Sequence, residues 1–309
     1  MSRLAFVFPG QGSQAIGMLA DLGASHGAIR ATFDAASAAL DLDLWALAQQ
    51  GPEADLNRTE NTQPVLLTAG VAVFRAWQAA AGKTPDFLAG HSLGEYTALV
   101  CAGALSLEDG VRLVALRGRL MQQAVPAGEG AMAAILGLDD DAVRQCCAEA
   151  SAAGVVEAVN FNAPGQVVIA GASAAVAVAI EKLKAAGAKR ALPLPVSVPS
   201  HCALMKPAAE QLRAALANVS FNTPVIPVVQ NVAARVEPDA DAIRDALVRQ
   251  LYSPVLWVQT VEALAQQGVS RALECGPGKV LCGLNKRIVK EMECASLENA
   301  EAFAAALAV

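Results

Sequence analysis

Cysteine is sparse and carries no pattern in this 309-residue chain. The seven cysteines lie at positions 101, 146, 147, 202, 275, 282 and 294. Their number is odd, they form no C-x-x-C pair, and they do not alternate with histidine as the ligands of a metal site do. We therefore expect reduced thiols and no metal site.

The chain also lacks a basic excess and long apolar runs. Its 23 Lys and Arg against 29 Asp and Glu give a net charge of −6, which provides no general attraction for nucleic acid or anionic lipid. No apolar stretch approaches the ~20 residues that span a bilayer, and the run at 4–8 is too short for the core of a signal peptide. We expect a cytoplasmic protein with no nucleic-acid or membrane partner.

Strands and helices alternate over most of the sequence. Short apolar runs at 4–8 and 86–89 predict buried strands, each followed by a glycine-containing turn, and the residues at 107–124 predict a long helix that ends before Pro126 and Gly128. After residue 201 the pattern predicts three more helices and a further strand. They are expected near 202–218, 239–251 and 254–267 for the helices and at 271–274 for the strand.

The predicted order of elements changes between residues 128 and 197, where we expect strand, helix, strand, strand, helix, strand. The expected elements are strands at 132–138, 155–161, 166–170 and 189–198 and helices at 139–152 and 173–186. We predict an α/β protein. Residues 1–127 and 198–309 would form a large, discontinuous, α/β-hydrolase-like catalytic domain with a parallel sheet, and residues 128–197 an inserted ferredoxin-like subdomain.

A G-x-S-x-G motif at 90–94 lies between a predicted strand and a predicted helix. In that context the glycines allow a sharp turn that exposes the serine hydroxyl, and the next N–H points at a developing oxyanion. The motif predicts Ser92 as a nucleophile and the Leu93 N–H as the first oxyanion donor. The alternative is a tight turn whose serine merely caps the helix.

A serine nucleophile needs a base, and histidine is the usual one near neutral pH. The chain has only three histidines. His91 adjoins Ser92 and is poorly placed to accept its proton, while His26 lies in a polar helical region far from any motif. Elimination favours His201, at the point where the chain leaves the predicted insertion.

The acid that orients the histidine in standard α/β-hydrolases has no obvious counterpart here. Roughly a third of the chain follows His201, and no acidic residue between Ser92 and His201 is marked by its position. The group that orients the imidazole could therefore be a backbone carbonyl.

Arg117 lies on an apolar stripe of the helix predicted at 107–124. Its i−4, i−3, i+3 and i+4 neighbours are Leu113, Val114, Leu120 and Met121. A buried cation needs a partner, because burying it unpaired costs several kcal/mol. Two partners are open: a carboxylate of the protein, or a substrate carboxylate held bidentately by the guanidinium.

Seven motifs, in order along essentially the whole chain, resemble the malonyl-CoA:acyl carrier protein transacylases of bacterial fatty acid synthesis. The motifs are Pro9-Gly10-Gln11-Gly12-Ser13-Gln14, Thr62-Gln63-Pro64, Gly90-His91-Ser92-Leu93-Gly94-Glu95, Arg117-Gly118-Arg119, Asn162-Ala163-Pro164-Gly165-Gln166, Pro199-Ser200-His201 and Gly276-Pro277-Gly278.

The resemblance implies a role for each of several residues. Ser92 would be the nucleophile, His201 its base and Arg117 the clamp on the malonyl carboxylate. Gln11 and Leu93 would form the oxyanion hole, the backbone carbonyl of Gln250 would orient His201, and Gln63 would line the site.

The same resemblance implies the reaction and its partners. Malonyl would pass from coenzyme A to Ser92 and then to the phosphopantetheine thiol of acyl carrier protein, for fatty acid chain elongation, in a two-step exchange without a cofactor. Related polyketide enzymes that prefer methylmalonyl carry Tyr-Ala-Ser-His where this chain has Val198-Pro199-Ser200-His201, which favours malonyl. Service to polyketide assembly or malonate metabolism remains an alternative.

We expect a monomer that docks the acidic carrier protein on a basic patch. The two candidate patches are Lys286, Arg287 and Lys290, and Lys182, Lys184 and Lys189. The alternative for each patch is an ordinary solvated helix face.

Two rival functions share some of these motifs. Gly10 to Ala15 fits the dinucleotide pattern G-x-G-x-x-A after a strand, although residues 28–40 predict a helix where a second strand should end in an acid. A serine hydrolase would share Ser92 and His201 but deliver the acyl group to water.

Overall fold

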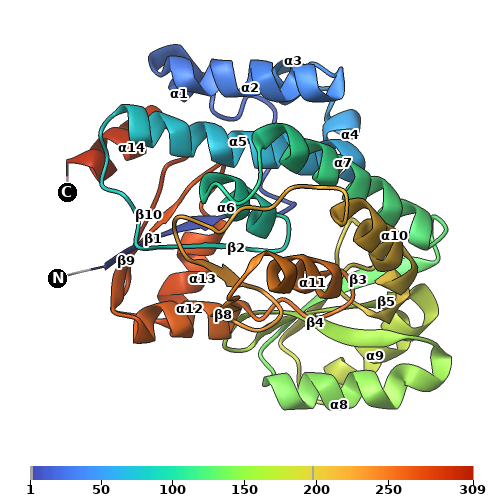
Figure 1. The fold of residues 1–309 in the computed structure, drawn as a ribbon. Coiled ribbons are helices and arrows are strands. Elements are labelled where there is room, and N and C mark those ends of the chain that lie inside the picture. Colours follow the sequence, from blue (N-terminus) through green and yellow to red (C-terminus); the bar gives the residue numbers. More distant parts are fainter. Residues whose placement is uncertain (1–2, 197, 309) are drawn as a thin grey trace.

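The computed structural model describes residues 3–196 and 198–308 as a mixed α/β fold with two sheets (Figure 1). Residues 1–2, 197 and 309 lie outside the described residues. The predicted range 1–127 begins among these residues, and the predicted ranges 128–197 and 198–309 end among them.

The larger sheet has six strands in the order β10-β9-β1-β2-β7-β8. Neighbouring strands from β10 to β7 are parallel, and only the β7–β8 pair is antiparallel. The strands are β1 (Arg3–Phe8), β2 (Phe87–Gly90), β7 (Val228–Gln230), β8 (Arg235–Val236), β9 (Val269–Glu274) and β10 (Glu293–Ser296). The predicted parallel sheet is therefore present.

Alternation along β1 divides the core into two layers, because successive side chains of a strand point to opposite faces. Phe6 and Phe8 belong to one apolar cluster, whereas Ala5 and Val7 belong to another. The first cluster packs beneath α5 (Thr59–Ala79), α6 (Gly94–Cys101) and α7 (Leu107–Ala124). The second packs against α12 (Trp257–Gln266) and α13 (Val280–Ile288), so helices cover both faces of the sheet (Figure 1).

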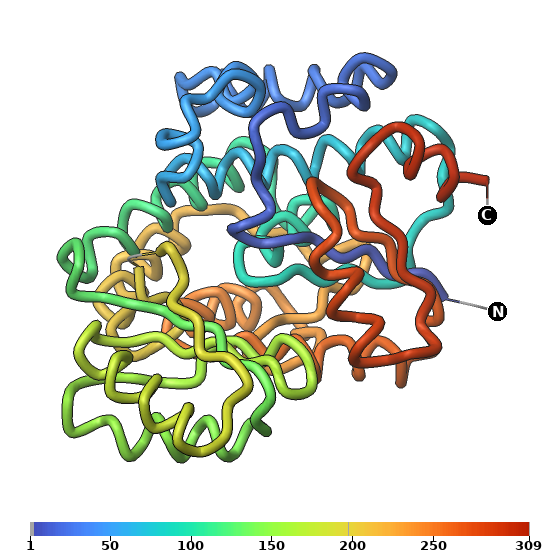
Figure 2. Tube along the Cα trace, turned by 180° about the vertical axis from the view of Figure 1, so that it is seen from behind, coloured from blue at the N-terminus to red at the C-terminus, as the bar shows by residue number. Residues whose placement is uncertain are grey.

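The N-terminal helices form an outer layer over α5 and α7 (Figure 1). They are α1 (Ala20–Ser25), α2 (Gly27–Leu40), α3 (Leu44–Gln50) and α4 (Glu53–Leu56). The described chain starts with β1 and ends with α14 (Ala300–Leu307), and both views show its two ends on the same side of the molecule (Figures 1 and 2).

The smaller sheet is antiparallel, with strands in the order β4-β5-β3-β6. Along the chain its elements are β3 (Gly130–Leu136), α8 (Asp140–Ala150), a short 3₁₀ turn (Ser151–Ala153), β4 (Val156–Ala163), β5 (Gln166–Ala172), α9 (Ser173–Ala185) and β6 (Arg190–Pro193). This is the strand-helix-strand-strand-helix-strand order that the sequence predicts. The sheet and its two helices have an apolar cluster of their own, which includes Ile135, Phe161 and Leu183.

Several predicted boundaries are wrong. Within the described residues, the strand expected at 189–198 is only β6, which ends at Pro193: Leu194 still donates to Met132, but Pro195 has no N–H to continue the pairing. The helix expected at 202–218 is a 3₁₀ turn (Ala203–Met205) followed by α10 (Lys206–Leu216), with Pro207 in the first turn of α10. The helices expected at 239–251 and 254–267 are α11 (Ala240–Gln250) and α12.

Close packing explains both glycines of the motif at 90–94. A Cβ atom on Gly90 would overlap the carbonyl of Gly94, and a Cβ atom on Gly94 would overlap the carbonyl oxygen of Phe8. The turn between β2 and α6 is therefore packed so closely that neither glycine position has room for a side chain.

We predict that Gly94→Ala lowers the free energy of unfolding by about 1–3 kcal/mol, the usual cost of overpacking. Denaturant unfolding followed by circular dichroism measures this. The control is Gly283→Ala in α13, where nothing lies within 4 Å of an added Cβ and where alanine should stabilise the helix by roughly 0.5–1 kcal/mol. Equal effects of the two substitutions would contradict this account of the turn.

Candidate active site

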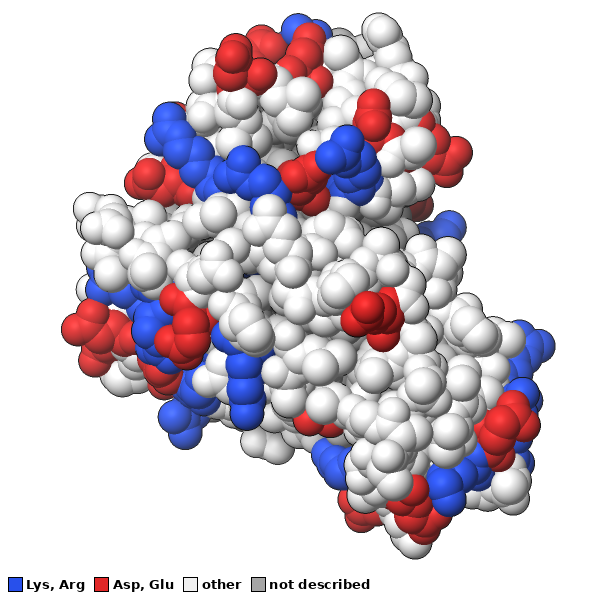
Figure 3. Space-filling model, turned by 90° about the vertical axis from the view of Figure 1, so that its right-hand side faces the viewer, with Lys and Arg blue, Asp and Glu red and all other residues white. Residues whose placement is uncertain are grey.

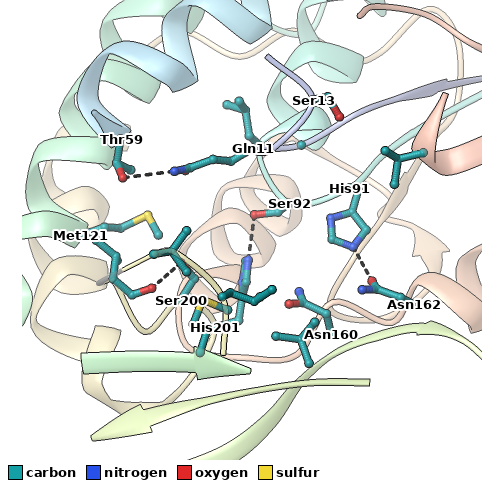
Figure 4. Close-up of a pocket in the computed structure, with 18 of the residues that line it drawn as sticks. Gln11, Ser13, Thr59, His91, Ser92, Met121, Asn160, Asn162, Ser200 and His201 are labelled. Atoms are coloured by element: carbon teal, nitrogen blue, oxygen red, sulfur yellow. Dashed lines mark hydrogen bonds between the residues drawn. The ribbon is translucent and has the colours of Figure 1, made fainter. Parts of the chain in front are cut away.

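A cavity of about 360 Å³ opens at the carboxyl ends of β1 and β2, between the two sheets. In the order β10-β9-β1-β2-β7, the strands that follow β1 in the sequence lie on both of its sides, with β2 and β7 on one side and β9 and β10 on the other. The strand order therefore reverses at β1, and ligands bind at such points of parallel sheets. The lining includes Gln11, Ser92, Arg117 and His201 around the larger sheet, and Met132, Asn160, Val168 and Leu194 from the smaller sheet and the segment that follows it (Figure 4).

Ser92 occupies the turn between β2 and α6, where it adopts a left-handed backbone conformation with φ of 51°. Such a strained strand-to-helix turn is what exposes a nucleophilic serine. The serine does not cap α6, because its hydroxyl oxygen lies 2.7 Å from Nε2 of His201 (Figure 4). The capping alternative is therefore wrong.

His201 has the partners that a general base needs. Its Nδ1 lies 2.7 Å from the backbone oxygen of Gln250 and donates to it, so Nε2 carries the lone pair that faces the Ser92 hydroxyl. Burial, reinforced by the positive charge of Arg117, lowers the pKa of His201 from 6.5 to about 3. A carbonyl takes the position that an acid holds in standard α/β-hydrolases, as the sequence suggested.

The other two histidines lie elsewhere. The His91 ring turns away from Ser92, with Nε2 2.8 Å from Oδ1 of Asn162, and burial lowers its pKa (Figure 4). His26 packs against the ring of Phe303. Neither ring is a hydrogen-bond partner of Ser92 within residues 3–196 and 198–308.

Arg117 is buried, with 1% of its surface exposed, and all its hydrogen-bond acceptors are neutral. Nη1 donates to Oε1 of Gln63 at 2.9 Å, and Nη2 donates to Oε1 of Gln250 at 2.9 Å and to the Ser92 hydroxyl at 3.2 Å. No carboxylate of the described chain forms an ion pair with it. The internal salt bridge is therefore wrong, and the guanidinium is available to an anionic ligand beside the nucleophile.

Gln250 contributes more than the carbonyl that the resemblance implied. Besides accepting from Arg117, its side chain donates from Nε2 to the backbone oxygen of Ser92 at 3.0 Å. It therefore joins Ser92, His201 and Arg117. No sequence signal identifies this side chain, because the last turn of an amphipathic helix often carries a polar residue.

Gln11 lies across the cavity from His201, with Nε2 3.3 Å from the Thr59 hydroxyl (Figure 4). Leu93 is the N-cap residue of α6, at the end of the helix where N–H groups have no carbonyl one turn earlier to bond. Both residues line the cavity near Ser92.

The glycine-rich turn after β1 lacks the context of a dinucleotide site. A dinucleotide fingerprint opens a helix directly after its strand, but β1 ends at Phe8 and α1 begins at Ala20. Residues 27–40 form α2 instead of leading to a second strand. The nucleotide-binding alternative is not supported.

The two basic patches differ in structure. Lys182 and Lys184 pair with Glu149 and Glu181 at 3.3 and 2.8 Å. Arg287 instead hydrogen-bonds Gln166, which lines the cavity, and the backbone oxygen of Pro164. On the face drawn in Figure 3, basic and acidic side chains are mixed around a broad uncharged middle.

The described residues contain neither a candidate membrane-spanning helix nor a candidate metal site. No helix there combines the length and the apolar character needed to cross a membrane. Those residues also contain no group of three or more His, Cys, Asp or Glu side chains that could hold a metal ion.

Comparison with known proteins gives one consistent answer. The acyl transferase domain family matches residues 5–302. The malonyl CoA-acyl carrier protein transacylase of Escherichia coli K12 is 61% identical over 307 residues, which cover 99% of each chain. The crystal structure of the malonyl-CoA:acyl carrier protein transacylase of Xanthomonas oryzae pv. oryzae has 58% identity and a TM-score of 0.98, over 100% of this chain and 98% of that one.

A third similar protein was solved with a partner. It is a malonyl-transacylase in complex with a type II PKS acyl-carrier protein, 56% identical, with a TM-score of 0.98 over 99% of both chains.

We predict that the His201 ring stays neutral from pH 8 down to pH 5. Because its folded-state pKa is lowered to about 3, protonation should begin only as the pH approaches that value and not near 6.5. NMR titration of ¹⁵N-labelled histidine rings measures this, with the signal assigned by its loss in His201→Gln. A titration midpoint near 6.5 for that signal would contradict the prediction.

Proposed function

The chain belongs to the acyl transferase domain family, and from that membership we propose that it transfers malonyl from coenzyme A to acyl carrier protein for fatty acid chain elongation. The observation that carries the proposal is the contact between Arg117 Nη2 and the Ser92 hydroxyl at 3.2 Å. In a malonyl thioester, a single methylene group separates the carboxylate from the thioester carbonyl. A malonyl carboxylate bound to this guanidinium therefore brings the thioester carbonyl to the Ser92 hydroxyl.

In the first half-reaction, the Ser92 oxygen attacks the thioester carbonyl while Nε2 of His201 takes the hydroxyl proton. The carbonyl oxygen becomes an oxyanion, which the N–H groups of Gln11 and Leu93 stabilise. The intermediate then collapses: the C–S bond breaks, His201 returns its proton to the sulfur, and coenzyme A leaves malonyl-Ser92.

The second half-reaction runs the same steps with a different thiol. The phosphopantetheine thiol of acyl carrier protein gives its proton to His201 and attacks the ester carbonyl. The C–O bond to Ser92 breaks, and the serine oxygen regains a proton from His201. One base thus serves both halves of the exchange, with no net change in the enzyme.

Arg117 also acts on the base through charge. Its guanidinium is one cause of the lowered pKa of His201. A malonyl carboxylate on Arg117 offsets that positive charge, so the pKa of His201 rises and the imidazole accepts a proton more readily. An acetyl group leaves the charge uncompensated. Malonyl is therefore favoured in proton transfer as well as in binding.

The carrier protein would approach the side of the cavity formed by α13. Of the three basic residues of this patch, Arg287 adjoins the cavity residue Gln166, whereas Lys286 and Lys290 line a separate hollow beside β10. The patch with Lys182 and Lys184 is less suitable because acids already neutralise those two lysines. An acidic partner at α13 would bring its thiol to the opening of the cavity.

In the proposed exchange one chain supplies every catalytic group, and no cofactor takes part. We describe residues 1–127 and 198–309 as a discontinuous α/β-hydrolase-like catalytic domain, and residues 128–197 as an inserted subdomain. The order β6-β3-β5-β4 with two helices on one side supports a ferredoxin-like description of the insertion. All the proposed site residues come from one chain, which supports action as a monomer.

We predict that radiolabelled malonyl-CoA forms a stable malonyl-enzyme, because transfer requires the ester to outlast the exchange of thiols. The label should discharge onto added holo-acyl carrier protein. It should be absent in Ser92→Ala, and His201→Ala should form it slower by orders of magnitude. Rapid release of free malonate would instead identify a serine hydrolase.

We predict that Arg117→Ala reduces kcat/KM for malonyl-CoA by about 100-fold, the cost of removing one partner of a buried charge pair. Acetyl transfer should change much less, since acetyl offers no carboxylate. The control is Arg119→Ala, two residues along α7 on its exposed side. Equal losses on malonyl and acetyl substrates would show that Arg117 is structural.

A further inference from the structure

A side chain from a distant strand holds the Ser92 backbone. The Ser92 N–H donates to Oδ1 of Asn231 at 2.7 Å, and Nδ2 of the same side chain donates to the Gly90 oxygen at 2.7 Å. Asn231 directly follows β7 and lies 139 residues from Ser92. One carboxamide therefore bridges the residue that ends β2 and the nucleophile.

Asn231 is itself fixed by a buried carboxylate. Its N–H donates to Oε2 of Glu95 at 2.6 Å, and its backbone oxygen accepts from the Leu256 N–H at 3.1 Å. Glu95 is in the first turn of α6, three residues after Ser92, and has no exposed surface. The hydrogen bonds thus run from α6 through Asn231 back to the turn that begins α6.

Glu95 occupies this position at a cost. Burial raises its pKa to about 7, although the Asn231 N–H, the Gln250 side chain and, at longer range, the charges of Arg117 and Arg249 lower it. It forms no ion pair within the described residues. An acid placed only for stability would gain more from a cation or from water.

The left-handed conformation of Ser92 explains what these bonds do. A non-glycine residue there is strained by roughly 1–3 kcal/mol and stays only where its surroundings determine it. Asn231 takes the Ser92 N–H and Gln250 donates to the Ser92 oxygen at 3.0 Å, so both backbone polar groups of the serine are fixed. The next N–H, that of Leu93, is then the one that faces the substrate.

We propose that Asn231 and Glu95 are positioning residues for the acyl transfer described above, on which this inference rests. Glu95 holds Asn231, and Asn231 holds the Ser92 peptide so that Oγ meets His201 and the Leu93 N–H meets the oxyanion. Besides its hydrogen bond to the Ser92 hydroxyl, Arg117 donates to Gln63 and Gln250, and these two bonds do not involve Asn231 or Glu95. We call the hydrogen bonds of Asn231 to Ser92, Gly90 and Glu95 the brace. Loss of the brace therefore slows acylation and leaves substrate binding unchanged.

The test measures single-turnover formation of malonyl-enzyme against malonyl-CoA concentration. Asn231→Leu keeps the branched skeleton of the side chain but makes neither of its hydrogen bonds. We expect an acylation rate at least about tenfold lower with unchanged half-saturation, since misplacement by about 1 Å can cost about 100-fold. Glu95→Ala should show a similar loss. Glu95→Gln should recover to within about threefold of wild type, because its amide oxygen still accepts the Asn231 N–H.

The matched control is Glu274, a second buried carboxylate that accepts a backbone N–H, from Cys282 at 2.8 Å. Glu274→Ala should lower the melting temperature and leave the acylation rate of the folded enzyme within about twofold of wild type, since it lies outside the brace. Circular dichroism verifies folding of each variant. Asn231→Ser, which cannot span both bonds, replaces Asn231→Leu should the latter not fold.

The results separate this inference from the proposed function. Folded Asn231 variants or Glu95→Ala that acylate at the wild-type rate would overturn the brace, as would a changed half-saturation with an unchanged rate. Glu95→Gln as slow as Glu95→Ala would also overturn it, because the role assigned is that of a hydrogen-bond acceptor. Wild-type enzyme that forms no malonyl-Ser92 would refute the proposed function itself.

Discussion

The 2.7 Å contact between the Ser92 hydroxyl and His201 Nε2 joins residues 109 positions apart, and the rest of the site is arranged around it. The serine must leave β2 through a left-handed turn, and His201 also has a positive φ, of 66°. Two strained residues facing each other persist only where surrounding groups fix them. Gln250 serves both, since its carbonyl accepts from the imidazole and its amide donates to the serine backbone.

Burial gives this contact its chemical character. His201 is 3% exposed and Arg117 is 1% exposed, so bulk water does not screen the interaction between the guanidinium charge and the imidazole. A buried guanidinium with neutral partners lowers the pKa of the base beside it, and it is also the feature most suited to recognise a carboxylate. In the proposed reaction, one charge would therefore couple substrate recognition to the strength of the base.

Much of this arrangement could be predicted from the sequence, since local patterns carry it. The G-x-S-x-G motif and the short apolar runs locate Ser92 between β2 and α6, the scarcity of histidine points to His201, and the apolar stripe around Arg117 predicts its burial. The side chains of Asn231, Glu95 and Gln250 could not be predicted in the same way. Their side-chain hydrogen bonds join residues 133 to 158 positions apart, and no local pattern encodes such pairs.

The elements and boundaries that the sequence did not predict have two physical causes. Strands β7 and β10, which no local pattern indicated, have three and four residues and are specified by the neighbours they pair with in the sheet. Segment 189–198 contains alternating apolar residues, but Pro193 and Pro195 remove the N–H groups that a longer strand would need. Tertiary pairing and proline chemistry decided these elements, and hydrophobic periodicity did not.

The cavity draws its reactive groups and its opposite wall from different sheets. Met132 and Val168 belong to β3 and β5, whereas Ser92 and Arg117 belong to the elements around the larger sheet. The wall opposite Ser92 can therefore change in volume without displacing Ser92 or His201. A fold built this way allows the shape of the cavity to vary independently of the groups proposed to transfer the proton.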